Sequence, residues 1–298
     1  MFLTEFVIKL INIKIFGGYT ATQLCDLDNE LANSNGKKLT GYSKARQNKI
    51  VDLHAAKVAC QECSLNQLCL PSSIDGTDLD KLDNIIERKR PLKRNEHLFQ
   101  VGSSFNSIYV VRSGSLKTYS PTVDGQEQVT GFHLPGELLG LDAIGKGQHP
   151  CAAKALETTS VCEVPFDNLE DLTQELPTLQ HQLLRLMSKE IFDDQELMLL
   201  LGKKTAEARL SAFLLSISLR FKQRGFSSSE FYLSMSRNDI ANYLGLAVET
   251  VSRMFTRFQE DGFIKAERKH IVINDRDMML QIAGINECCE DSPTEKTV

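Results

Sequence analysis

The sequence lacks the long apolar run that a membrane-spanning helix requires. No stretch of about 18 apolar residues occurs anywhere in its 298 residues. The apolar start resembles a signal peptide, but Glu5, Lys9 and Lys14 interrupt it and no clear small-residue cleavage site follows. We therefore predict a cytoplasmic protein with no membrane partner. In such a protein thiols stay reduced, so clustered cysteines bind metal or react more often than they form disulfides.

The sequence also lacks the common signatures of catalysis. It contains no GxSxG nucleophile turn, no phosphate-binding P-loop and no HExxH zinc helix. We therefore predict that the chain is not an enzyme.

The chain has no overall excess of positive charge, because its net charge is −5, but basic residues outnumber acidic ones in one segment. Residues 203–276 carry 13 Lys and Arg against 8 Asp and Glu. Residues 1–202 carry 20 against 26, and residues 277–298 carry 1 against 5. A basic segment between acidic ones is typical of a nucleic-acid-binding module attached to another domain, although a solvated basic face can show the same pattern.

The first half of the chain predicts a helix followed by a β-rich domain. Residues 78–90 have apolar residues at helical spacing behind a possible cap at Asp75 or Thr77, and Pro91 would end that helix. From about 97 to 166, short β-rich runs alternate with turn signals. Several short strands at that spacing indicate an antiparallel barrel or roll.

Residues 177–201 predict one long helix with Pro177 in its first turn. Its apolar positions alternate three- and four-residue steps, as in a coiled-coil seam, which favours a homodimer over a helix packed only on its own domain. Asp194 is the exception, because two such carboxylates facing each other in a parallel dimer would repel. We expect Asp194 to weaken the dimer until another interaction stabilises it. The predicted seam comprises Leu184, Met187, Ile191, Asp194, Met198 and Leu201.

Residues 236–258 carry the pattern of a helix-turn-helix. Ser236 is the expected N-cap of the first helix, with Asp239 three residues later. Gly245 stands where a tight turn is needed. An ordinary helical hairpin with a polar outer face is the alternative. In the second helix we expect Val248, Val251, Phe255 and Phe258 to point inward, and Glu249, Ser252, Arg253, Thr256 and Arg257 to point outward.

The outward face carries side chains that can read the major groove of DNA. Arg can donate two hydrogen bonds to guanine, Glu can accept one from cytosine, and Ser can serve either role. The N-terminal part of a recognition helix contacts the bases, which favours Glu249, Ser252 and Arg253. The predicted DNA-binding residues are Glu249, Thr250, Ser252, Arg253 and Arg257.

The next segment predicts the β-hairpin of a winged helix. Its strands are expected at about 263–267 and 270–273. Arg268, Lys269 and His270 at the tip could approach phosphates, a contact that positions a protein on DNA without reading the bases.

Three of the eight cysteines, Cys60, Cys63 and Cys69, lie within ten residues, and no second CxxC pair accompanies them. An iron–sulfur cluster of the 4Fe-4S type binds four thiolates, and a structural zinc site also uses four ligands. The fourth ligand must therefore come from another part of the chain. The residues alone leave the choice open among His54, Cys25, Cys151, Cys162, Cys288 and Cys289.

Between about residues 55 and 284 the sequence resembles the oxygen-responsive FNR/Anr branch of the CRP/FNR family of bacterial transcription regulators. The stretches CQECSLNQLC, LDNIIERK, TGFHLPGELLGLDAIG, ALETTSVCEVPF and RNDIANYLGLAVETVSR carry the resemblance. The expected fold is α+β. It comprises an N-terminal cysteine loop, an antiparallel β-roll like a cyclic-nucleotide-binding domain, a long dimerisation helix and a C-terminal winged helix-turn-helix.

The resemblance implies that Cys60, Cys63, Cys69 and Cys162 bind one 4Fe-4S cluster, so that Cys162 is the fourth ligand. It implies a global regulator that senses oxygen through the cluster, forms a homodimer without oxygen and contacts RNA polymerase. The expected target is double-stranded DNA with palindromic TTGAT-N4-ATCAA sites, each half-site read by Glu249, Ser252 and Arg253.

The alternative function is a CRP-like regulator that does not sense oxygen and is stapled by zinc or responds to a small ligand. The cyclic-nucleotide-binding relatives hold the phosphate with an Arg next to a hydroxyl residue. The corresponding stretch, CAAKALE at residues 151–157, has Lys154 as its only cation. We therefore expect no cyclic nucleotide.

These observations divide the chain into five predicted segments. They are a disordered extension (1–50), the iron–sulfur-binding loop with the roll (51–176), the dimerisation helix (177–202), the DNA-binding domain (203–284) and a disordered acidic tail (285–298).

Overall fold

The structure, a computed structural model, describes residues 59–74, 76–122 and 124–285. A β-roll, a long helix and a winged helix-turn-helix follow one another along the chain. The predicted α+β fold class is therefore confirmed. The predicted extension at 1–50, and the tail beyond residue 285, lie outside the described residues.

The roll consists of two four-stranded antiparallel sheets, with strand orders β1-β8-β3-β6 and β2-β7-β4-β5. Apolar residues such as Val111, Leu116 and Val161 are buried together in the roll and form its core. The strands are β1 (Glu87–Arg88), β2 (His97–Phe99), β3 (Ser107–Ser113), β4 (Leu116–Pro121), β5 (Glu127–His133), β6 (Leu138–Leu139), β7 (Ala152–Ala155) and β8 (Ser160–Pro165).

The cysteine-rich segment precedes the roll as three short 3-10 turns, η2 (Cys60–Glu62), η3 (Asn66–Leu68) and η4 (Leu70–Ser73). Helix α3 (Gly76–Ile85) follows them. The prediction of a helix over 78–90 was wrong at its end, because Glu87 and Arg88 pair with β8 instead of continuing the helix.

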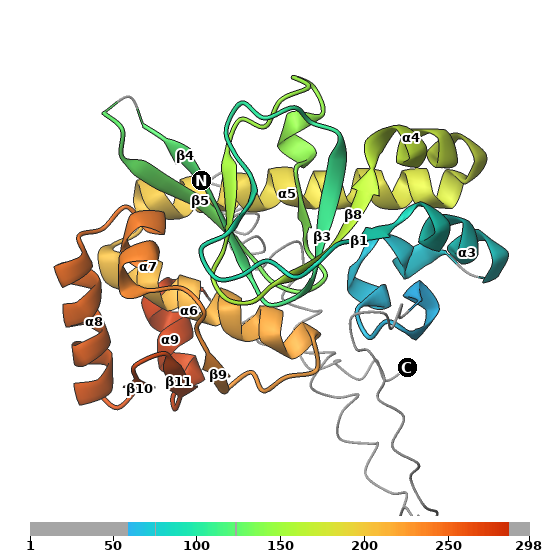
Figure 1. Cartoon of the computed structure of the whole chain (residues 1–298). Helices are drawn as coiled ribbons and strands as arrows, with labels where there is room; N and C mark the ends of the chain where they lie inside the picture. The colour runs from blue at the N-terminus through green and yellow to red at the C-terminus, as the bar shows by residue number, and fades with distance from the viewer. Residues whose placement is uncertain (1–58, 75, 123, 286–298) are drawn as a thin grey trace, which may run out of the picture.

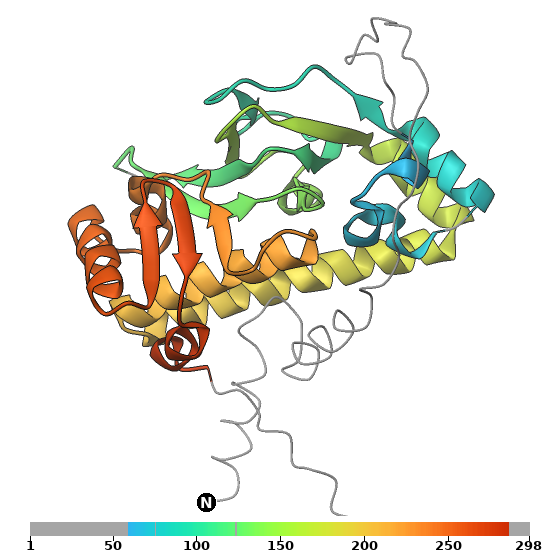
Figure 2. The same ribbon diagram turned by 90° about the horizontal axis from the view of Figure 1, so that it is seen from below.

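Helix α4 (Phe166–Glu175) leads into α5 (Pro177–Lys203), which has 27 residues. At 1.5 Å per residue α5 is about 40 Å long. Figures 1 and 2 show α5 running along the molecule, with α3 and the cysteine-rich turns near one end and the helix-turn-helix near the other. The long helix therefore connects the two regions for which the sequence predicts a function.

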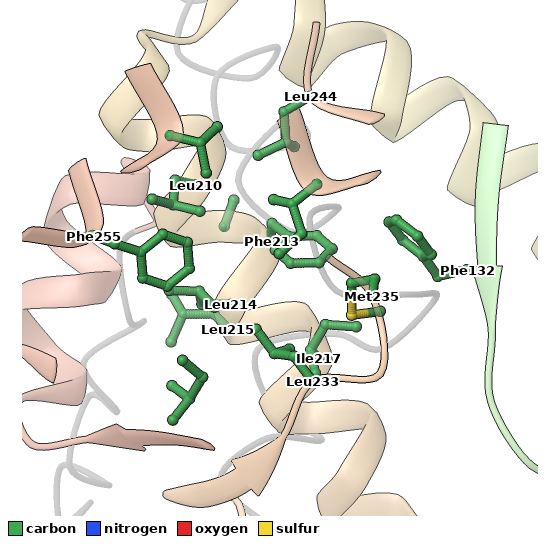
Figure 3. Packing of buried hydrophobic residues seen from close by; sticks show 14 of the residues in the cluster. Phe132, Leu210, Phe213, Leu214, Leu215, Ile217, Leu233, Met235, Leu244 and Phe255 are labelled. Atoms are coloured by element: carbon green, nitrogen blue, oxygen red, sulfur yellow. The ribbon is translucent and has the colours of Figure 1, made fainter. Parts of the chain in front are cut away.

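The C-terminal part is a winged helix-turn-helix built around one hydrophobic core. Figure 3 shows this core, in which Phe132 from the roll faces Phe213. Their ring centroids lie 5.9 Å apart, so the roll and the winged helix-turn-helix share packed side chains. The elements are α6 (Ala206–Gln223), β9 (Glu230–Tyr232), α7 (Arg237–Tyr243), α8 (Val248–Glu260), β10 (Ile264–Glu267), β11 (His270–Ile273) and α9 (Arg276–Ala283).

Candidate cysteine cluster and nucleic-acid interface

The structure brings together four thiols from two distant segments. Cys60, Cys63 and Cys69 belong to the 3-10 turns, and Cys162 lies in β8. Burial is the largest cause of the raised pKa of Cys69, and repulsion from the other three thiolates raises that pKa further. Burial also raises the pKa of Cys60 to about 12, with smaller contributions that include Asp83 and Cys162. Cys60, Cys69 and Cys162 pack in one hydrophobic cluster, and Cys63 lies three residues from Cys60.

The residues present fit an iron–sulfur cluster in their donor chemistry. Four thiols are what a 4Fe-4S cluster requires, and coordination to a metal deprotonates a thiol that burial would otherwise keep neutral. Among the described residues, no three His, Cys, Asp or Glu side chains already surround the position of a single ion. The fit therefore rests on the four thiols and their proximity, and the four ligands stay a prediction.

Cys151, the other candidate among the described residues, lies elsewhere. It is buried in the core of the roll, and its thiol donates a hydrogen bond to Asp142 Oδ2 at 3.3 Å. Burial raises its pKa to about 12, with Asp142 adding to the effect. Cys25, Cys288, Cys289 and His54 lie outside the described residues. Of the cysteines that the structure describes, Cys162 is thus the one that joins the triplet.

A charged pair that the sequence did not predict lies beside these thiols. The β1–β8 register places Arg88 directly opposite Cys162. Arg88 Nη2 lies 2.5 Å from Asp83 Oδ1 and 3.9 Å from Cys60 Sγ. Asp83 Oδ1 also accepts a hydrogen bond from the Cys60 backbone N–H at 3.1 Å. The only signal in the sequence is that both residues fall within LDNIIERK, one of the stretches that carry the resemblance.

At the other end of α5, the helix-turn-helix is built as its sequence predicts. The Ser236 hydroxyl accepts a hydrogen bond from the Asp239 N–H at 3.1 Å, and the Asp239 carboxylate accepts one from the Ser236 N–H at 3.0 Å. This reciprocal capping box begins α7. Gly245 has a φ of 61°, a left-handed conformation that suits glycine and forms the turn before α8.

The face of α8 that the sequence predicts to be inward is mostly buried, because Val251, Phe255 and Phe258 lie in the core, while Val248 is half-buried. Glu249, Ser252, Arg253, Thr256 and Arg257 are exposed, and Thr250 is half-buried. Among the described residues Arg253 has no ion-pair partner. Arg257, by contrast, forms ion pairs with Glu207 of α6 and with Asp261.

The wing contains the two predicted strands and a third, β9, that the sequence analysis missed. At its tip, Lys269 Nζ donates to the Ser234 carbonyl at 2.5 Å, and His270 Nε2 lies 2.8 Å from Glu230 Oε1. Within the described part of the chain, the side chain of Arg268 has no such partner. It is exposed at a residue with a φ of 58°.

The roll and the DNA-binding part are joined by ion pairs that the sequence did not reveal. Glu137 accepts hydrogen bonds from Arg220 and Arg224 of α6. Burial alone would raise the pKa of Glu137, but the two guanidinium groups outweigh it and hold that pKa well below its usual range. Lys117 of β4 lies 2.8 Å from Asp239 of the capping box. The ion pairs of Glu137 and of Lys117 therefore both link the roll to the C-terminal part.

Arg209 of α6 also holds the helix-turn-helix in place. Its guanidinium donates to the backbone carbonyls of Leu201 at 2.7 Å, Lys204 at 3.1 Å and Leu244 at 3.1 Å. It therefore connects the end of α5 to the turn of the helix-turn-helix.

That the roll binds no cyclic nucleotide stays a prediction. Lys154, the cation in the stretch that holds the phosphate in the cyclic-nucleotide-binding relatives, lies 3.6 Å from Glu127 and is therefore not a free cation.

The predicted seam on α5 leaves large apolar side chains in contact with solvent. Leu184, Ile191 and Met198 are 56%, 59% and 69% exposed. Met187 and Leu201 are half-buried, and Asp194 is exposed.

The comparisons with known proteins agree with this architecture. Residues 89–175 match the model of the cyclic nucleotide-binding domain, and residues 233–264 match that of bacterial regulatory proteins of the crp family. The transcriptional activator protein Anr of Pseudomonas aeruginosa is 56% identical over 225 residues, which is 76% of this chain and 92% of that protein. This chain belongs to the CRP/FNR family of transcription regulators. It is similarly 52% identical over 227 residues to the fumarate and nitrate reduction regulatory protein of Escherichia coli, covering 76% of this chain and 91% of that protein.

Solved structures of CRP/FNR regulators show the same fold. FixK2 from Bradyrhizobium japonicum matches with a TM-score of 0.60 and 30% identity, covering 66% of this chain and 97% of that chain. The prediction that the chain is not an enzyme is confirmed, because its relatives are transcription regulators. No helix in the described part of the chain is long and apolar enough to span a membrane.

Proposed function

We propose that this CRP/FNR regulator senses oxygen through a 4Fe-4S cluster bound by Cys60, Cys63, Cys69 and Cys162. The observation that carries the proposal is the packing of Cys60 and Cys69 with Cys162 in one hydrophobic cluster, although these residues belong to two segments separated by most of the roll. The similarity to Anr and to the fumarate and nitrate reduction regulator supports it. When bound, the cluster would supply a redox-sensitive centre whose sulfides oxygen can oxidise.

The packing of the cysteine-rich turns gives a route from the thiols to α5. Cys60 and Leu70 belong to one buried cluster that also contains Leu179 of α5. Ligation by Cys162 ties these turns to β8, and the ordered turns then cover the N-terminal part of α5. If the cluster is bound more tightly by the dimer than by the monomer, it shifts the equilibrium toward the dimer. The cluster would thereby offset the repulsion at Asp194.

The homodimer would form along Leu184, Met187, Ile191, Met198 and Leu201 and present two copies of α8 to a palindrome. Recognition helices of such dimers contact half-sites one DNA turn apart. A monomer would lose the second half-site and most of its affinity at physiological salt.

Within each half-site, Glu249, Ser252 and Arg253 would read TTGAT-type bases, with Thr250 beside them. Arg257 would reach DNA only by exchanging its contact with Glu207. We further propose that the dimer acts in the cytoplasm and contacts RNA polymerase through turns of the roll such as residues 112–115.

One experiment tests the oxygen-sensing function directly. The protein is purified without oxygen, its visible spectrum, iron and acid-labile sulfide are measured, and binding to TTGAT-N4-ATCAA DNA is followed by fluorescence anisotropy before and after air is admitted. A brown protein that bleaches and loses DNA binding in step supports the proposal. A colourless zinc protein whose DNA binding ignores oxygen would contradict it and support the zinc-stapled alternative.

A further inference from the structure

Arg88 contacts both segments of the candidate cluster site. Its backbone pairs with Cys162 in the β1–β8 ladder, and its Nη2 lies 3.9 Å from Cys60 Sγ. Its side chain is only 14% exposed. A guanidinium so far removed from water requires a partner for each N–H group that it buries.

The contact with Asp83 does not account for the whole of this guanidinium. Asp83 Oδ1 accepts from Arg88 Nη2 at 2.5 Å, which is the atom that also approaches Cys60. Arg88 Nε is buried and has no hydrogen-bond partner among the described residues. A buried N–H donor beside thiols, without an acceptor of its own, suits a site whose remaining acceptors are sulfur atoms.

We propose that Arg88 is a positioning residue for the cluster, which donates N–H···S hydrogen bonds to Cys60 and to sulfur atoms of the cluster and so sets its reduction potential. This inference rests on the proposed oxygen-sensing function, because it requires that the four thiolates hold a cluster. Hydrogen bonds to the sulfurs and the net charge nearby are two of the factors that fix the potential of an iron–sulfur centre. Asp83 would orient the guanidinium and fix the backbone of Cys60.

The direction of the effect follows from charge. Reduction adds a negative charge to the cluster, so a neighbouring cation stabilises the reduced form more than the oxidised form. Removing the charge of Arg88 should therefore shift the potential to a more negative value. The cluster would then be oxidised more easily. Its iron would also be held less tightly, because replacing a residue that supports metal ligands typically lowers metal affinity about 10- to 100-fold.

The test compares wild type with Arg88→Gln and Arg88→Lys, all purified without oxygen. Arg90→Gln is the matched control, because Arg90 is close in sequence but 70% exposed and paired with Glu96. Two quantities are measured: the reduction potential, by spectroelectrochemical titration, and the rate of iron release to a chelator under argon. We expect Arg88→Gln to have a more negative potential and about 10- to 100-fold faster iron release.

Arg88→Lys separates charge from hydrogen bonding. Lysine keeps the charge but lacks the planar fork, so its potential should stay near wild type while iron release is faster than in wild type. Arg90→Gln should match wild type in both measurements.

Wild-type potential and iron release in both Arg88 variants would overturn the inference and leave the oxygen-sensing function standing. If Arg88→Gln does not fold, unchanged iron release in Arg88→Lys would overturn the hydrogen-bonding role by itself. A wild-type protein that holds zinc and no iron would instead refute the proposed function, and this inference with it.

Discussion

The two ends of α5 carry sites that are built in opposite ways. At the helix-turn-helix end, α7, the turn and α8 form one uninterrupted segment with a capping box, and its buried face packs into a core that it shares with α6 and the roll. At the cysteine end, the site needs the 3-10 turns, α3, β1 and β8 to meet. A site made of one segment keeps its shape when its surroundings change. A site made of distant segments exists only while they are held together, which suits a region that responds to its ligand.

The largest expected effect comes from removing the one ligand that the distant strand supplies. Cys162→Ser should abolish the brown colour of the anaerobic protein and its oxygen-dependent DNA binding, because three thiolates of one segment no longer connect to β8. The winged helix-turn-helix should keep its circular dichroism and melting behaviour. Cys151→Ser serves as the control, since that thiol bonds Asp142 and lies in the roll core. Full iron and sulfide content in Cys162→Ser would refute the assignment of the fourth ligand.

The next effect concerns the joint between the two ends. Glu137→Gln leaves Arg220 and Arg224 without their carboxylate, and breaking a fully buried pair costs about 3–5 kcal/mol. Because 22% of the Glu137 side chain is exposed, we expect a smaller loss of about 2–3 kcal/mol in urea unfolding at pH 7. Glu127→Gln is the control, because that carboxylate is more exposed and lies farther from its lysines.

The pH dependence of this loss checks its origin. The pKa of Glu137 is lowered in the folded protein, so the ion pairs stabilise it fully above the unfolded pKa of about 4.3. That contribution is lost as the pH falls through 4.3 toward the folded value. The difference in unfolding free energy between wild type and Glu137→Gln should therefore shrink from pH 6 toward pH 3. A difference that grows on acidification would contradict the assigned role.

A third comparison separates base reading from phosphate binding at the DNA end. Arg253→Ala should cost about 1–3 kcal/mol on the cognate site and relax specificity at one base, because a bidentate contact to guanine is lost. Arg268→Ala, at the wing tip, should weaken binding to all sequences alike and reduce the salt slope by about one. Anisotropy titrations on cognate and scrambled DNA at several salt concentrations distinguish them. Equal weakening on both DNAs by Arg253→Ala would argue against base reading.

The smallest effect is expected on the seam that joins the two ends. Asp194→Ala should raise the dimer fraction of metal-free protein, because it removes a carboxylate that would face its own copy. Although Asp194 is exposed, partial loss of hydration and the neighbouring Asp193 already raise its pKa. We expect a gain of about 1 kcal/mol or less, measured by sedimentation velocity. Asp193→Ala is the control, since Asp193 pairs with Lys189 at 2.5 Å. Unchanged sedimentation of Asp194→Ala would contradict the proposed repulsion at Asp194, on which the expectation of a cluster-dependent dimer rests.

Features that depend on short-range interactions could be predicted from the sequence, and those that depend on distant partners could not. The cap at Ser236, the turn at Gly245 and the buried face of α8 depend on neighbours within a few residues, and all three agree with the structure. The end of the helix at 78–90 was wrong because the pairing partner of Arg88 lies in β8. No local pattern in Glu87 or Arg88 announces that partner.

The sequence by itself determined the order of the parts, the helix-turn-helix and the cluster of three cysteines, because periodicity, capping and spacing act along the chain. Residue spacing left Cys151 and Cys162 both open as the fourth ligand, and only the resemblance favoured Cys162. Tertiary structure alone decided that Arg88 pairs with Cys162 and approaches Cys60, and that Glu137 links the roll to α6. These contacts join residues far apart in sequence. They arise only when sheet register and helix packing bring the segments together, and no spacing along the chain encodes that geometry.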